Sequence, residues 1–209
     1  AARDVVVLSC EDVLIPSGGD TLFKGVTYAL TGCGLPYYVL STQPREKASE
    51  LLLAQGGGEL FEDFTVDSPR LVSVLSPTEN HKSDHKSSSD HKSNHKSNHM
   101  SHGDKISAVR AIAERTPPST RLHFVDNDPE ILNAVASEVG GGVRLYLTSW
   151  GPGSNVDERQ REEFLTEEPY QVIGLTEFVE LMKMGIIMAY GIDSHRQFAL
   201  DALYRNPSA

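Results

Sequence analysis

The feature that most constrains the fold is an alternation, along nearly the whole chain, of short apolar runs with longer stretches of helical periodicity. The runs are rich in β-branched or aromatic residues and end in polar ones, and they lie at 5–8, 37–40, 71–75, 122–125, 143–147 and 171–175. Such runs are typical of strands buried on both faces of a parallel sheet. Strands separated by helices predict an α/β domain with three layers, in which a doubly wound, mostly parallel sheet lies between helices.

Helices are predicted between these runs because apolar residues recur there at helical spacing, and glycine or proline marks several of the ends. They are expected over 20–32, after Pro44, around 106–113, around 131–136, around 178–182 and from Asp193 or Ser194 onward. We therefore expect a single domain over residues 1–209, with residues 176–209 as a C-terminal helical extension. Only residues 16–36 separate the first two strands. This leaves room for one helix, but not for a substantial cap domain inserted over the end of the sheet.

Composition excludes several classes of function. The chain has 19 Lys and Arg against 29 Asp and Glu, a formal charge of −10. An acidic chain lacks the positive charge that nucleic acid or an anionic membrane surface requires, so no nucleic-acid partner is expected. No apolar run approaches the roughly 20 residues that span a bilayer, so the chain is predicted not to be membrane-spanning. Cys10 and Cys33 are too few for a disulfide scaffold and are expected to be free thiols.

Residues 81–102 form a low-complexity insertion of degenerate HKSD-like repeats. The segment holds six of the eight histidines, four lysines and seven serines, but one apolar side chain, Met100. With so little to bury, it is predicted to be an exposed loop. Two interpretations stay open: a polar insertion that binds Zn²⁺ or Ni²⁺ only adventitiously, and a metal-capturing loop. The candidate ligands are His81, His85, His91, His95, His99 and His102.

Polar residues follow three of the predicted strands, and ligands of doubly wound sheets bind at the carboxyl ends of the strands. The sequence reads VVVLSCEDVLI around the first strand, YYVLSTQ around the second and LHFVDND around the fourth, with Gly103-Asp104-Lys105 opening a helix between them. Several of these acidic and amide residues also have a structural interpretation. Asp126, Asn127 and Asp128 are well placed to cap the helix after Pro129, and Glu11 and Asp12 to form a solvated loop pair.

The order of these four motifs resembles that of the haloacid dehalogenase (HAD) superfamily. A later stretch, LYLTSWGPGSN, makes the chain similar to a plant and cyanobacterial group of HAD-like proteins, and the resemblance covers roughly residues 4–182. It implies a first-strand Asp that attacks phosphorus, a carboxylate two residues later as acid and base, and Mg²⁺ held partly by a fourth-motif Asp. It also implies a Ser or Thr and a Lys that hold the phosphoryl oxygens.

Carried onto this chain, the resemblance puts Ser9 at the nucleophile position and Glu11 at the acid/base position. Ser41 and Lys105 fall at the phosphate-binding positions, and Asn127 stands where the fourth-motif Asp is expected, between Asp126 and Asp128. A hydroxyl and an amide thus replace two carboxylates that Mg²⁺ would prefer. Glu11, Asp126, Asn127 and Asp128 remain weak candidates for metal ligands, because a local shift of the backbone could bring a carboxylate to the metal.

We therefore expect a pseudoenzyme: a HAD fold with a degraded phosphatase site, in which Ser9 and Glu11 are vestigial and no cofactor is bound. Its predicted role is that of a non-catalytic accessory or binding subunit with a protein partner in a larger assembly. The alternative is a Mg²⁺-dependent phosphoester hydrolase with an altered nucleophile. The resemblance to the plant group and a start without Met favour an organellar stroma or matrix, such as that of the chloroplast, over the cytoplasm.

Overall fold

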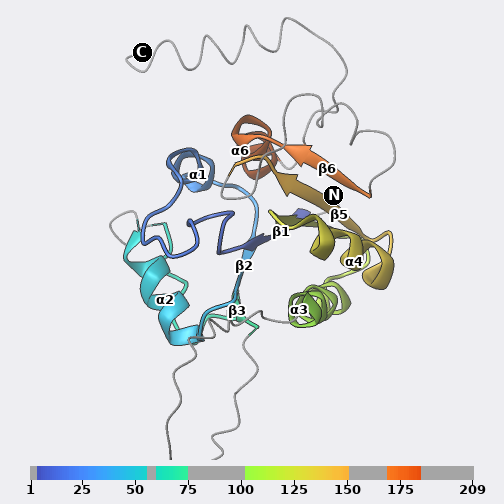
Figure 1. Cartoon of the computed structure of the whole chain (residues 1–209), viewed down its shortest axis with the longest axis horizontal. Helices are drawn as coiled ribbons and strands as arrows, with labels where there is room; N and C mark the ends of the chain where they lie inside the picture. The colour runs from blue at the N-terminus through green and yellow to red at the C-terminus, as the bar shows by residue number, and fades with distance from the viewer. Residues whose placement is uncertain (1–3, 56–59, 75–101, 151–168, 185–209) are drawn as a thin grey trace, which may run out of the picture.

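The described strands form one sheet of six in which every neighbouring pair is parallel (Figure 1). The computed structural model describes residues 4–55, 60–74, 102–150 and 169–184. The prediction of a doubly wound parallel sheet is confirmed. The strands are β1 (Asp4–Ser9), β2 (Tyr37–Ser41), β3 (Leu71–Ser73), β4 (Arg121–Asp126), β5 (Val143–Thr148) and β6 (Tyr170–Ile173).

The strand order places the candidate site at the centre of the sheet. The order is β3-β2-β1-β4-β5-β6, so the chain builds outward from β1 to β3 and then returns to the other side of β1 to add β4. The direction of winding therefore reverses between β1 and β4. In doubly wound sheets this reversal opens a crevice at the carboxyl ends of the two strands, and ligands bind there.

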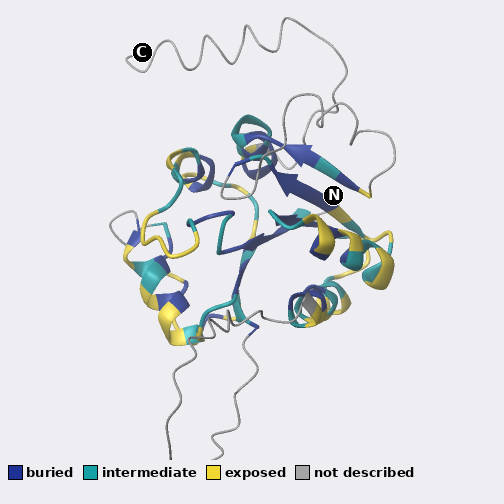
Figure 2. Cartoon of the chain, in the orientation of Figure 1, coloured by how far each residue is buried: buried dark blue, intermediate teal, exposed yellow. Residues whose placement is uncertain are grey.

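Helices cover both faces of the sheet (Figure 1). The apolar residues of α1, α2 and α6 pack with one set of strand side chains, and those of α3 and α4 pack with the other. Figure 2 shows the buried sides of these helices turned toward the sheet. The helices are α1 (Lys24–Leu30), α2 (Arg45–Leu53), α3 (His102–Arg115), α4 (Pro129–Val139) and α6 (Leu175–Met184).

Helix α1 begins later than the helix predicted over 20–32, and the side chain of Gln55, which follows α2, accounts for the later start. The Gln55 amide nitrogen donates to the Asp20 carbonyl at 2.6 Å, and the Leu22 N–H donates to the Gln55 amide oxygen at 3.1 Å. These two bonds satisfy backbone groups outside a helix, and Phe23 has the extended ψ of 135° at the N-cap position. Tertiary hydrogen bonds thus override the local helical pattern. Between β1 and β2, a stretch that is described throughout, α1 is the one helix.

The chain between β6 and 184 belongs to the core of the domain. Phe178, Leu181 and Met182 of α6 are fully buried, and α6 packs against α1. The predicted strand over 171–175 ends earlier, at Ile173, because Leu175 begins α6 and the Glu177 carboxylate accepts the Gly174 N–H at 2.9 Å.

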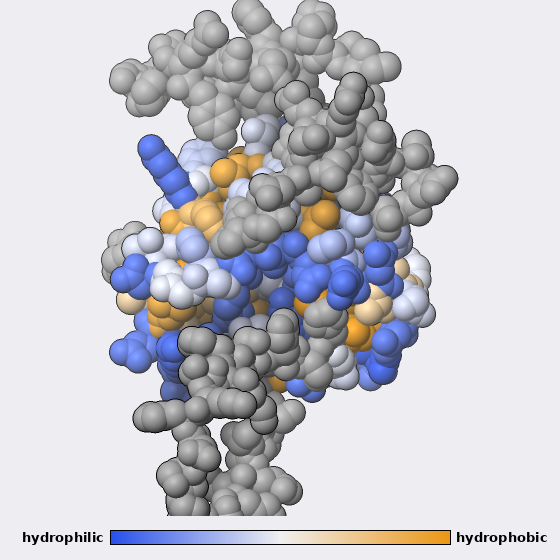
Figure 3. Space-filling view, viewed as in Figure 1, coloured by the Kyte–Doolittle hydropathy of each residue, from blue (hydrophilic) through white to orange (hydrophobic). Residues whose placement is uncertain are grey.

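Two predicted segments lie outside the described residues: the His-rich insertion, apart from His102 at the start of α3, and the helix from Asp193 or Ser194. Among the helices that are described, none combines the length and the apolar character needed to cross a bilayer. On the face drawn in Figure 3, hydrophilic side chains predominate and apolar patches lie among them. Within the described part, the large exposed apolar side chains are Tyr28 and Val66, and the Lys183 ammonium lies 4.5 Å from the centre of the Tyr28 ring.

Candidate functional site

The ends of β1 and β4 bring two of the predicted residues side by side. Leu8 pairs with Val125, so Ser9 and Asp126 follow at the next position of the two strands. Successive side chains of a strand point to opposite faces. Val7 and Phe124, two residues earlier, belong to the core under α3 and α4. Ser9 and Asp126 therefore point to the same face as α3, whose first turn carries Lys105.

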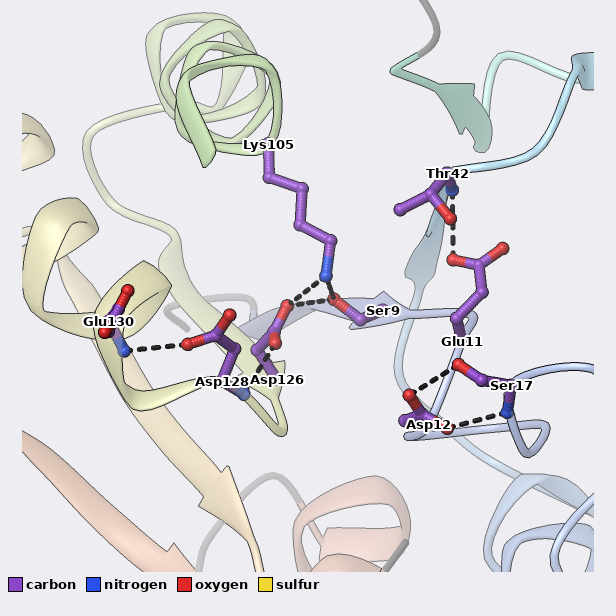
Figure 4. Close-up of polar contacts among 9 residues, drawn as sticks. All are labelled: Ser9, Glu11, Asp12, Ser17, Thr42, Lys105, Asp126, Asp128 and Glu130. Atoms are coloured by element: carbon purple, nitrogen blue, oxygen red, sulfur yellow. Dashed lines mark hydrogen bonds and ion pairs between the residues drawn. The ribbon is translucent and has the colours of Figure 1, made fainter. Parts of the chain in front are cut away.

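Ser9, Lys105 and Asp126 form a closed polar cluster, which we call the serine–lysine–aspartate cluster (Figure 4). The Ser9 hydroxyl donates a hydrogen bond to Asp126 Oδ2, and the Lys105 ammonium lies 2.9 Å from the same oxygen. Lys105 Nζ also donates to Ser9 Oγ at 3.4 Å. Ser9 and Asp126 are 0% exposed and Lys105 is 8% exposed. The cluster therefore pairs one buried carboxylate with one buried ammonium.

Asp126, and not Asn127, meets the end of β1. The resemblance placed the fourth-motif carboxylate at Asn127, but the alternation of β4 sends Asp126 to the side of Ser9 and Lys105. The second Asp126 oxygen accepts the Asp128 N–H at 2.9 Å. The sequence itself indicates this placement of Asp126. Phe124 and Asp126 point to one face of the strand, and Asn127, one residue later, follows the opposite phase.

Glu11 does not lie with this cluster but with the end of β2. Its Oε1 accepts the Ser41 hydroxyl at 2.7 Å, and its Oε2 accepts the Thr42 N–H at 3.0 Å. Ser41 Oγ in turn accepts the Gln43 N–H at 3.0 Å. The sequence identified Glu11 and Ser41 separately, but it did not indicate that one would bind the other.

Asp12 has a role in the turn after β1. Its φ of 63° lies in the left-handed region, which Asp and Gly tolerate better than most residues. Its carboxylate accepts both the hydroxyl and the N–H of Ser17, at 2.6 and 2.7 Å. The sequence allows Glu11 and Asp12 to form a solvated loop pair. The structure instead gives each carboxylate specific protein partners (Figure 4).

Asp128 is the N-cap of α4, as the capping interpretation predicted. Its carboxylate accepts the Glu130 N–H at 2.9 Å, and Pro129 occupies the first helical turn. The Trp150 indole N–H donates to the Val13 carbonyl at 2.9 Å, and the Trp150 ring packs against Phe178.

Cys10 and His123 are core residues, and Cys33 is half-buried against the core. Burial raises the pKa of the Cys10 thiol well above its ordinary value, so this group remains protonated at neutral pH. Burial likewise raises the pKa of Cys33, whose thiol donates to the Met182 carbonyl at 3.0 Å. His123 is fully buried inside β4, and its Nδ1 lies 3.0 Å from the Tyr146 hydroxyl.

The described residues do not offer a ready-made metal site. Among them, no three His, Cys, Asp or Glu side chains lie close enough together to hold one ion. At the strand ends, Asp126 is the carboxylate beside Ser9, and it is already paired with Lys105. A hydroxyl and one ion-paired carboxylate are a poor donor set for Mg²⁺, which binds through carboxylates. The histidines of the insertion, apart from His102, lie outside the described residues.

The fold and the position of the site define a class: three-layer α/β proteins with a polar site at the carboxyl ends of the central strands. The chain is similar to the solved structure of a protein from Burkholderia xenovorans described as a haloacid dehalogenase-like hydrolase. The TM-score is 0.50 at 12% identity, over 87% of this chain and 97% of the other. This chain therefore has a haloacid dehalogenase-like fold. No family model matches the sequence, and no curated protein matches it.

Proposed function

We propose that this chain is a non-catalytic member of the haloacid dehalogenase-like fold and serves as an accessory or binding subunit of a larger protein assembly. The observation that carries the proposal is the serine–lysine–aspartate cluster. In it, the groups that phosphoryl chemistry would need are bonded to one another and withdrawn from solvent.

The first support for the proposal is the charge balance of the site. The site supplies one carboxylate beside Ser9, and the Lys105 ammonium at 2.9 Å neutralises it. A divalent cation would have to displace or repel this ammonium, and it would gain one anionic ligand in return. Because Coulomb interactions are strong where water is excluded, this balance opposes a Mg²⁺ ion. The proposed role therefore does not use magnesium.

The second support for the proposal is the burial of Ser9. Ser9 is 0% exposed, so a phosphorus atom cannot approach its oxygen without a rearrangement of the cluster. The alternative function, a phosphoester hydrolase with an altered nucleophile, draws on the Ser9–Asp126 hydrogen bond, because a carboxylate there could accept the serine proton. An aspartate is however a weak base for this task, and this oxygen is also bonded to Lys105.

The first test compares Ser9→Asp with Ser9→Asn. The aspartate adds the missing carboxylate, whereas the asparagine has the same shape without the charge. We expect Mg²⁺ to stabilise Ser9→Asp alone. At about 100 times its Kd, the ion should raise the free energy of unfolding by about 2.7 kcal/mol, measured by thermal denaturation with and without Mg²⁺. Equal stabilisation of the wild type by Mg²⁺ would contradict the charge argument.

The second test asks for activity directly. The wild type should show no Mg²⁺-dependent hydrolysis of a generic phosphomonoester. Turnover that disappears in Ser9→Ala would overturn the proposal in favour of the hydrolase, whose nucleophile would be Ser9. The accessory role is tested by size-exclusion chromatography of native extract, in which the protein should elute in a larger complex. Elution of the whole pool as a 209-residue monomer would contradict that role.

A further inference from the structure

We propose that a second ligand site, for a small organic anion with an apolar body, lies at the end of the sheet opposite the serine–lysine–aspartate cluster. A pocket of about 440 Å³ opens there, between the C-terminal ends of α3 and α4 and the first residues of β4 and β5. Ligand pockets in proteins commonly measure about 300–1,000 Å³ and combine apolar walls with a few polar groups. Because the cluster lies at the carboxyl ends of the strands, the pocket is separate from it and does not depend on the proposed function.

The inner wall of the pocket is the edge of the core between the sheet and its two helices. Helices α3 and α4 pack against each other over this face (Figure 1). Ala113, Val139 and Val143 line the pocket and pack against the core cluster that contains the buried Leu122. All three are only partly buried, so apolar surface stays open to solvent here. A ligand with an apolar body gains free energy by covering this surface.

The wall that follows α3 is a turn whose shape is fixed by its own bonds. Pro117 and Pro118 line the pocket and restrict the backbone of the turn. The Thr120 N–H donates to the Pro117 carbonyl at 2.8 Å, and the Thr116 N–H donates to the Ala113 carbonyl at 3.1 Å. The wall is therefore formed before a ligand arrives, and binding loses little free energy to ordering it.

Two arginines at the starts of the strands give the pocket a positive rim. Arg121 is the first residue of β4 and Arg144 the second of β5, and both are exposed where they line the pocket. Asp4 balances Arg121 through bonds of 2.7 and 3.0 Å, whereas no carboxylate of the described residues forms an ion pair with Arg144. A guanidinium in this position favours a carboxylate or sulfonate head group. Because the whole chain carries a formal charge of −10, an anion would be attracted by this local charge and not by the protein in general.

The experiment measures the binding of anilinonaphthalene sulfonate, an apolar ring system with one anionic group, by its fluorescence. This probe and the uncharged phenylnaphthylamine are titrated separately into the full chain at neutral pH. Wild type should bind the sulfonate at a single saturable site. Arg144→Met should bind the sulfonate about tenfold more weakly, because a charge-assisted hydrogen bond is lost, and should bind the uncharged probe as wild type does.

Variants that fill the pocket show where the probe binds. Gly141 and Gly142 line the pocket, and a Cβ added at either meets nothing within 4 Å, so a larger side chain is accommodated there without a clash. At least one of Gly141→Leu and Gly142→Leu should bind both probes about tenfold or more weakly than wild type. Gly34→Leu is the matched control, because it also adds a side chain in open space but lies outside the pocket, and it should bind as wild type does. Circular dichroism checks that each variant is folded.

Three results would overturn the inference. The first is that wild type does not bind the sulfonate saturably. The second is that the folded Gly141 and Gly142 variants bind both probes as tightly as wild type, which would place the probes elsewhere. The third is that Arg144→Met leaves sulfonate binding unchanged or weakens both probes equally, which would remove the anionic head group from the proposal. Each of these results would leave the serine–lysine–aspartate cluster and its proposed role untouched.

Discussion

Lys105 is the residue on which the charge balance of the buried site depends. Its ammonium is the cation 2.9 Å from Asp126, whose side chain is fully buried. We expect Lys105→Met to lower the free energy of unfolding by about 3 kcal/mol, because removal of one partner leaves a buried charge uncompensated. Urea denaturation at neutral pH measures this loss.

The control for Lys105 is Lys47→Met, which removes an exposed ammonium from α2 and should change stability by about 0.5 kcal/mol or less. Adding Asp126→Asn to Lys105→Met should recover part of the loss, since no unpaired charge then remains. If Lys105→Met is as mild as Lys47→Met, the ammonium is not what compensates Asp126.

At the scale of elements, the contact between α1 and α6 is crowded at Gly25, which faces the Leu175 side chain. A Cβ added at Gly25 would lie 2.8 Å from Leu175 Cδ1, closer than real Cβ atoms approach. We expect Gly25→Val to lower the free energy of unfolding by about 1–3 kcal/mol, as overpacking does in other cores. Thermal denaturation measures the change.

A compensating substitution distinguishes crowding from a change in helix propensity. Leu175→Ala removes the atoms that a new side chain at Gly25 would meet. The double variant should therefore be more stable than the sum of the two single losses predicts, which is the mark of a direct contact. Strict additivity of the two stability losses would show that a side chain at position 25 does not clash with Leu175.

At the scale of the whole molecule, a buried histidine links three neighbouring strands and makes stability depend on pH. Burial lowers the pKa of His123 below its ordinary 6.5, and the charges of Arg144 and Arg121 act in the same direction, although Asp4 opposes them. The nearest carboxylate oxygen, Asp4 Oδ1, is 3.4 Å from Nε2, which has no well-aligned hydrogen-bond partner.

Because the folded pKa of His123 is lowered, the unfolded chain takes up the proton first as pH falls. This contribution to stability is complete above pH 6.5 and is lost as pH falls from there toward the folded pKa. We expect the free energy of unfolding to fall in this window by up to about 1.4 kcal/mol per pH unit. Urea denaturation at several pH values should show this slope in wild type and not in His123→Gln. An unchanged slope in the variant would assign it to another group.

Much of the architecture was predictable because it depends on local patterns. The apolar runs of β1 and β4 identify buried strands, and the Asp128-Pro129 pair marks the start of α4. The candidate site was predictable in part: Ser9, Ser41 and Lys105 all lie at strand ends or in the first turn of a helix, as expected. Alignment by motif pointed to Asn127, whereas the alternation of side chains along β4 places Asp126 beside Ser9.

By itself, then, the sequence determined the parallel α/β class, the acidic charge and the residue types available at the strand ends. These follow from periodicity and composition, which are properties of short segments. The tertiary structure alone decided the strand order, the pairing of Asp126 with Ser9 and Lys105, and the hydrogen bonds that Glu11 accepts from Ser41 and Thr42. Such pairings join residues separated by 21 to 117 positions. No local pattern encodes them, because they arise only when the chain has packed its strands in one order and excluded water between them.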